Sequence, residues 1–232
     1  MSRFRYALVI VGVLLVAANV VAKFGPPDAT LILGPVAAVA LVVVARWAGL
    51  SFTELGMGRR QLARGAVYAA VAISVVGVGM VLIAELPLTR AAFSDQRYQM
   101  PMSEALWTVF VIVPLGTILP EEIAFRGVLW GMLARRSGPT FATVVSSVVF
   151  GLWHILPSLR LHVVNPAVTA AVGVGGSAAF LAVAAAVLFT ALAGIVFCEL
   201  RRRSGSLLAP IGLHWAVNGL GVLVTSALAG RQ

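Results

Sequence analysis

Six polar residues in the second half of the chain could carry out chemistry, because they lie inside long apolar stretches. They are Glu121, Glu122, Arg126, His154, His214 and Asn218. Ionisable groups at membrane depth are costly, face the protein interior and mark functional sites. The spacing places Glu122 with Arg126, and His214 with Asn218, four residues apart on one helical face. A shared buried site built from three helical segments is therefore predicted.

Hydrolysis of a peptide bond is one reaction that these groups could support. It needs an activated water and donors for the oxyanion that forms on the carbonyl. The sequence offers no serine or cysteine nucleophile with a base at motif spacing. On a helix, Glu121 and Glu122 point about 100° apart. Glu122 shares a face with Arg126, which predicts a structural ion pair and leaves Glu121 free to hold water. Pro120 is expected to kink the helix just before Glu121.

A purely structural reading of each motif also exists. A Glu and an Arg four residues apart can simply fix a helix, and a membrane His or Asn can hydrogen-bond to a neighbouring helix. The three motifs together favour a site, because they contain almost all the strongly polar groups at depth.

The ordered motifs resemble those of a known family. Glu121-Glu122-x-x-x-Arg126, Phe150-x-x-x-His154 and His214-x-x-x-Asn218 lie on successive apolar segments, and this order is similar to the CAAX protease and bacteriocin-processing family of intramembrane peptidases, the type II CAAX prenyl endopeptidase-like proteins. The resemblance implies a glutamate-dependent endopeptidase without a cofactor. In it, Glu121 and His154 would activate the water, His214 and Asn218 would donate to the oxyanion, and Glu122 and Arg126 would give structural support.

Other functions remain open at this point. A zinc peptidase could use Glu121, His154 and His214 as ligands, although Asn218 suits an oxyanion donor better than a zinc ligand. Buried Glu, His and Arg also form proton relays in transporters, and the same fold could serve as a non-catalytic scaffold or immunity protein. The expected partners are the lipid bilayer and a peptide or membrane-protein substrate, whose prenylation the sequence does not decide.

The amino-acid composition indicates which kind of secondary structure positions these residues. Of the 232 residues, 60% are hydrophobic and 11% are charged, and the mean hydropathy is +1.01. These values exclude a soluble globule and predict an all-α, polytopic membrane bundle of about seven transmembrane helices. The net charge of +9 does not indicate nucleic-acid binding, since the basic residues lie between apolar runs. The predicted spans are residues 6–22, 29–45, 65–84, 105–133, 137–159, 178–198 and 204–230.

The chain is expected to divide into two parts. Residues 1–103 would form amino-terminal helices 1–3, and residues 104–232 the catalytic membrane core. The uncharged stretch from Val163 to Cys198 is too long for one crossing, and the Gly173–Gly176 cluster is predicted to break it. Met1–Ala22 is interpreted as an uncleaved first span rather than a secretory signal.

Basic residues predict the orientation. One side receives Arg3, Arg5, Arg46, Arg59, Arg60, Arg64, Arg135, Arg136, Arg201, Arg202 and Arg203, and the other receives Lys23, Arg90, Arg97, Arg160 and Arg231. The amino terminus is therefore expected in the cytoplasm and the carboxyl terminus outside. The Ala- and Val-rich chain suggests a bacterial plasma membrane. If the Arg-rich loops frame its mouth, the site is expected to open toward the cytoplasm.

Overall fold

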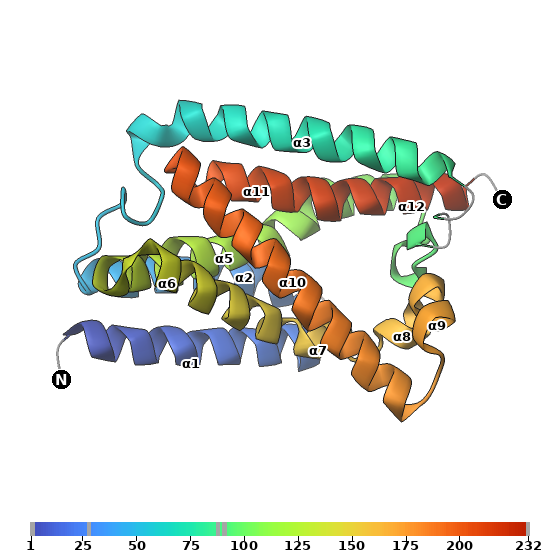
Figure 1. The fold of residues 1–232 in the computed structure, drawn as a ribbon, viewed down its shortest axis with the longest axis horizontal. Helices are drawn as coiled ribbons and strands as arrows, with labels where there is room; N and C mark the ends of the chain where they lie inside the picture. Colours follow the sequence, from blue (N-terminus) through green and yellow to red (C-terminus); the bar gives the residue numbers. More distant parts are fainter. Residues whose placement is uncertain (1–2, 27–28, 87–88, 90–91, 231–232) are drawn as a thin grey trace.

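The protein is an all-helical bundle in the computed structural model, which describes residues 3–26, 29–86, 89 and 92–230. Within these residues there are helices, turns and loops but no β-strand. Long helices run side by side along the molecule (Figure 1). The predicted all-α membrane fold is confirmed, and the protein is an integral membrane protein.

The first three predicted spans are confirmed as long helices. They are α1 (Arg3–Phe24), α2 (Ala29–Trp47) and α3 (Leu62–Glu85). Their large apolar side chains point outward, as lipid-facing residues do; Val16 of α1 is 66% exposed and Val75 of α3 is 67% exposed. Each helix is long enough to cross the hydrocarbon core.

The fourth and fifth predicted spans form one helical hairpin. Helical structure continues through residues 102–158, whose 57 residues would extend more than twice the roughly 30 Å of a bilayer core. Gly138 interrupts it with a left-handed φ of 83°, which a residue with a side chain rarely adopts. Trp130 donates to Thr143, and Ser146 donates to the carbonyl of Phe125, so the two arms run antiparallel. With this turn the bundle has about seven crossings.

The first arm of the hairpin alternates between α-helical and wider π-helical turns. Its elements are α4 (Met102–Trp107), η4 (Thr108–Ile112), η5 (Pro114–Ile118), α5 (Leu119–Glu122), η6 (Ile123–Leu129) and the start of α6 (Trp130–Trp153). Pro114 and Pro120 lack the backbone N–H that an α-helix needs, and π turns often occur at functional sites. The irregular backbone therefore surrounds the Glu121–Glu122 pair.

The rest of the chain completes the bundle. It comprises α7 (Ile155–Ser158), α8 (Leu161–Val164), α9 (Pro166–Val172), α10 (Gly176–Ser204), α11 (Leu208–Trp215), η7 (Ala216–Leu220) and α12 (Gly221–Ala229). The predicted break at Gly173–Gly176 is confirmed, since Gly173 and Gly175 have φ of 79° and 105°. The short helices α8 and α9 precede it, so only α10 crosses the membrane in this stretch.

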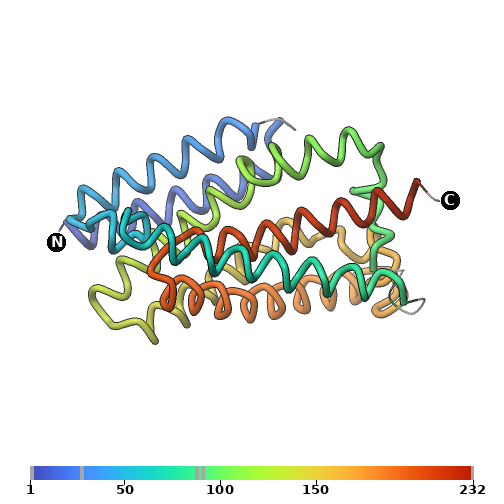
Figure 2. The backbone as a smooth tube through the Cα atoms, turned by 90° about the horizontal axis from the view of Figure 1, so that it is seen from above, coloured from blue at the N-terminus to red at the C-terminus, as the bar shows by residue number. Residues whose placement is uncertain are grey.

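The two ends of the bundle differ in charge. The start of α1, the loop after α2, the Gly138 turn and the junction between α10 and α11 lie at one end (Figures 1 and 2). We call this the Arg-rich end. Arg135 donates to the carbonyl of Gly49 at 2.8 Å, and Arg201 donates to that of Glu54 at 2.9 Å. The predicted sorting of arginines into one set of loops therefore matches their position in the fold.

One apolar core joins the amino-terminal helices to the segments that carry the motifs. Ala7, Val11 and Leu41 of α1 and α2 pack in the same cluster as Phe125 and Phe150. The six polar residues are thus held by helices from both halves of the chain.

Candidate active site

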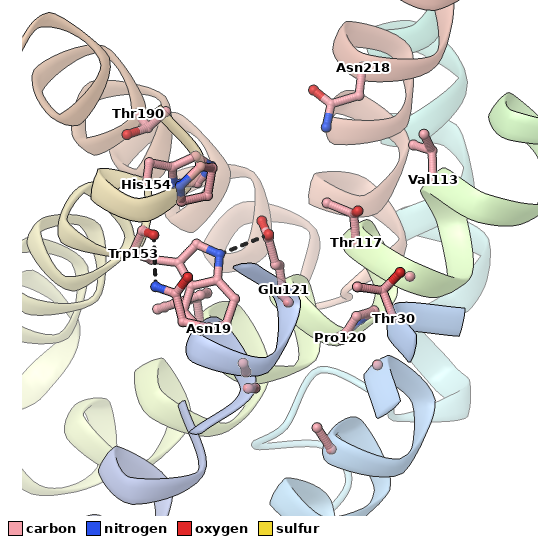
Figure 3. A pocket seen from close by; sticks show the side chains of 18 of the residues that line it. Asn19, Thr30, Val113, Thr117, Pro120, Glu121, Trp153, His154, Thr190 and Asn218 are labelled. Atoms are coloured by element: carbon pink, nitrogen blue, oxygen red, sulfur yellow. Dashed lines mark hydrogen bonds between the residues drawn. The ribbon is translucent and has the colours of Figure 1, made fainter. Parts of the chain in front are cut away.

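Glu121 lies at the inner end of a large cavity (Figure 3). Its side chain is 9% exposed. Oε1 accepts a hydrogen bond of 2.9 Å from the indole N–H of Trp153, which fixes the carboxylate. Oε2 is buried and has no hydrogen-bond partner among the residues that the structure describes. One carboxylate oxygen is therefore held in place and the other is left for a further donor.

Glu122 lies in a separate, fully buried network. Its Oε1 accepts from Arg126 Nη1 at 3.2 Å and from His214 Nδ1 at 2.8 Å. Glu122 and Arg126 are both 0% exposed, so the ion pair predicted from their spacing is confirmed. The link to His214 was not predicted, because no sequence rule connects residues on α5 and α11. The two adjacent glutamates thus occupy different surroundings, as expected from their divergence on a helix.

Aromatic rings surround the buried Arg126. The guanidinium carbon lies 3.9 Å from the centre of the Phe150 ring and 4.7 Å from that of Phe197. Within the described residues, its Nε and Nη2 have no hydrogen-bond partner. The ring faces therefore supply the compensating interaction, which gains strength in a desolvated setting. This contact gives Phe150, the first residue of the second motif, a structural role.

His154 and His214 have defined ring orientations. His154 Nδ1 lies 2.8 Å from the carbonyl of Phe150, and His214 Nδ1 bonds to the Glu122 carboxylate. Because a carbonyl and a carboxylate accept, the proton is on Nδ1 in both rings. The Nε2 atom of each ring is the one left for chemistry. His214 Nε2 lies 4.0 Å from Glu121 Oε2.

The cavity brings together three of the six residues predicted for the site. It has a volume of ≈ 810 Å³, and its lining includes Glu121, His154 and Asn218. Asn218 on η7 lies across the cavity from His154 (Figure 3). His214, Glu122 and Arg126 are outside the lining, where His214 and Arg126 both donate to Glu122. A cavity of this size can hold a drug-sized ligand or a short peptide segment.

Two polar residues of the site escaped the sequence prediction. Trp153 precedes His154 in the chain and binds Glu121, and Asn19 of α1 donates to the carbonyl of Trp153 at 2.9 Å. A signal existed for both: a Trp N–H inside an apolar span needs an acceptor, and a lone Asn in a span usually bonds to another helix. Neither signal identifies the residue to which the Trp or the Asn is hydrogen-bonded.

The direction in which the cavity extends corrects one expectation. Its lining includes the second half of α1, the first half of α2, and residues 92, 93, 95, 98 and 165. The loop before α4 and the start of α9 lie at the end of the bundle opposite to the Arg-rich end, and the halves of α1 and α2 that line the cavity are those farther from the Arg-rich end (Figure 1). The expected opening between the Arg-rich loops is wrong, because buried apolar side chains such as Phe125, Val128 and Met132 fill the space between Glu121 and those loops.

Two segments meet at the outer part of the cavity. Asp95 caps the short helix η3 (Gln96–Tyr98) and is 5% exposed. It accepts from Arg97 and, at 3.1 Å, from the side chain of Asn165, which caps α9. Burial disfavours the charged form of Asp95, but the hydrogen bonds from Arg97 and Asn165 outweigh it and lower the pKa of the carboxyl. The ionised Asp95 therefore ties the loop before α4 to α9.

The structure is a polytopic helical bundle with a cavity lined by Glu121, His154 and Asn218. The sequence matches the family described as type II CAAX prenyl endopeptidase Rce1-like over residues 103–220, about half of the chain. The chain belongs to this family, which is one of membrane proteases. No curated protein and no solved structure was found to match the chain. The matched residues contain all three motifs and exclude α1, α2 and α3.

Proposed function

We propose that the protein is an intramembrane endopeptidase in which Glu121 activates a water for attack on a peptide bond. The observation that carries the proposal is the surroundings of the Glu121 carboxylate. One oxygen is anchored by Trp153 at 2.9 Å, and the other is buried, unpaired among the described residues and 4.0 Å from His214 Nε2. The residue itself lines a cavity that can hold a peptide. A general base needs this combination of fixed geometry and a free acceptor oxygen.

The neighbouring side chains support roles in the same step. The ring of His154 keeps its proton on Nδ1, so Nε2 can accept a proton from the water or from Glu121. His214 can donate to an oxyanion through Nε2 only when both ring nitrogens carry protons, because Nδ1–H is bound to Glu122. The amide N–H of Asn218, which lines the cavity, is a second candidate donor.

We propose further that the reaction does not require zinc. Among the described residues, no three His, Cys, Asp or Glu side chains are grouped so that they could hold a metal ion. The purified protein is expected to keep its activity after prolonged treatment with a strong chelator. Loss of activity that added zinc restores would overturn this proposal.

The function is tested by comparing protein termini in native membranes. Cells that carry the wild-type protein should contain cleaved membrane-associated proteins that are intact in cells with Glu121→Ala. Cells with an exposed control substitution, Glu104→Ala on α4, should match the wild type. Identical sets of termini in all three membranes would contradict proteolysis at this site. Family membership favours a hydrolase over the transporter and scaffold alternatives.

A further inference from the structure

The cavity that leads to Glu121 has one polar end and one sealed end. Its outer part is lined by Ala92, Phe93 and Asp95 from the loop before α4 and by Asn165 at the start of α9. Ala92 is exposed, and Phe93 and Asn165 are partly exposed. Water and solutes can therefore approach the cavity between these two segments.

The opposite end is closed by packing. Between Glu121 and the Arg-rich loops lie Phe125, Val128 and Met132, each 0% exposed, together with Leu50 and Leu55 from the loop after α2. That loop is fastened by the hydrogen bonds from Arg135 to Gly49 and from Arg201 to Glu54. A protein interior packed in this way leaves no route for a peptide.

The lining also restricts the chemistry of the segment that can enter. It consists mostly of Ala, Val, Leu, Thr and Gly, and within the described residues it includes no Lys or Arg. The one carboxylate near the mouth, Asp95, already has Arg97 and Asn165 as partners. Among the described residues, a charged segment would find no unpaired counter-ion in the outer part of the cavity, whereas a neutral apolar segment would be stabilised by burial.

We propose that substrates reach Glu121 from the Arg-poor end, which the positive-inside rule places outside the cytoplasm, and that they are neutral, apolar segments of proteins exposed on that face. The proposal rests on the proposed function of Glu121.

Single-cysteine labelling tests the route, and the chain suits it because its one cysteine, Cys198, is buried and can be replaced by Ala. Thr117→Cys on η5 and Thr190→Cys on α10 place a thiol on the cavity wall, where both residues are partly exposed. Arg59→Cys marks the Arg-rich end and Gln96→Cys the opposite end. Val75→Cys faces lipid and should not react. A small, uncharged but membrane-impermeant thiol reagent is added to sealed spheroplasts or to inside-out vesicles.

The expected result is that both wall cysteines react from the side that labels Gln96→Cys, and that this side is the outside of the spheroplast. Reaction only from the side that labels Arg59→Cys would overturn the proposal, as would failure of both wall cysteines to react from either side. The labelling is repeated with Glu121→Gln present. If the labelling pattern is the same with and without Glu121→Gln, the access route is established independently of whether Glu121 is the catalytic base. In the comparison of termini, cuts should fall in apolar segments on the outer face, and cuts confined to cytoplasmic segments would contradict the substrate class.

Discussion

The two adjacent glutamates depend on different partners: Glu121 accepts from Trp153, and Glu122 accepts from Arg126 and His214. The spacing of Glu122 and Arg126 predicted an ion pair, which the 3.2 Å contact confirms, because residues four apart share a helical face. The contact of Glu122 with His214 joins residues 92 positions apart and depends on how α11 packs. The hydrogen bond from Trp153 to Glu121 likewise depends on packing, because the two residues lie on different arms of the hairpin.

Trp153 is expected to act as a positioning residue for Glu121. Trp153→Phe keeps an aromatic ring and removes the N–H donor. A hydrogen bond to a charged group contributes about 1.5–3 kcal/mol, so kcat should fall roughly ten- to hundredfold while KM changes little. Steady-state kinetics on a native substrate measure this.

A matched control separates this role from general loss of structure. Trp130→Phe removes the indole bond to Thr143 at 3.1 Å, at a site away from the cavity lining. It should lower thermal stability slightly and leave kcat near the wild-type value. Equal kcat for Trp153→Phe and wild type would show that the bond to Glu121 does not matter for the reaction.

At the scale of the helices, apolar length predicted nearly all boundaries. The break predicted at Gly173–Gly176 is present, and the one predicted between residues 133 and 137 falls at Gly138, just inside the predicted fifth span. The π turns around Glu121 could not be predicted, because Pro114 and Pro120 show only that regular hydrogen bonding must change and not how. The packing of α10 against α6 could not be predicted either, because it joins residues that are far apart in the sequence.

Helices α6 and α10 approach closely at Gly151, and a methyl group there is expected to destabilise the protein. A Cβ added to Gly151 would lie 2.7 Å from the carbonyl oxygen of Val187. Overpacking of this kind costs about 1–3 kcal/mol, so Gly151→Ala should lower the unfolding temperature in detergent. Gly79→Ala on α3 is the matched control, since no atom lies within 4 Å of its added Cβ, and Ala favours helix over Gly. Equal unfolding temperatures for the two variants would contradict the close packing.

The two segments at the cavity mouth are expected to separate in acid. The folded state lowers the pKa of Asp95, so its ionised form stabilises the fold above the ordinary aspartate pKa of about 3.9. This stabilisation is lost as the pH falls through the lower folded-state value. Asp95→Asn should therefore make protease cutting of the loop before α4 faster at neutral pH and less dependent on acid than in the wild type. Wild-type and variant loops cut at the same rate from neutral pH to pH 3 would disprove the coupling.

For the whole molecule, charge predicted the two ends of the bundle but not the direction of the site. Sorting the arginines by loop required only the alternation of spans, and the Arg-rich loops do lie together (Figure 1). The opening depends on which side of Glu121 the core fills. That is decided by the packing of Phe125, Val128 and Met132 against α1 and α2, which a list of spans does not contain. The amino-terminal helices outside the matched family region therefore shape the path to the site.

The separate roles of the two adjacent glutamates are the central claim, and cleavage by purified protein measures them most directly. The wild type, Glu121→Gln and Glu122→Gln are compared on a native substrate in lipid vesicles, with thermal unfolding recorded for each. Glu121→Gln is expected to unfold like the wild type and to lose at least about a hundredfold in kcat, as removal of a general base does. Glu122→Gln is expected to lose about 3–5 kcal/mol of stability, because it leaves Arg126 buried without its partner. Wild-type cleavage by a folded Glu121→Gln protein would contradict the account, and opposite behaviour of the two variants would exchange their roles.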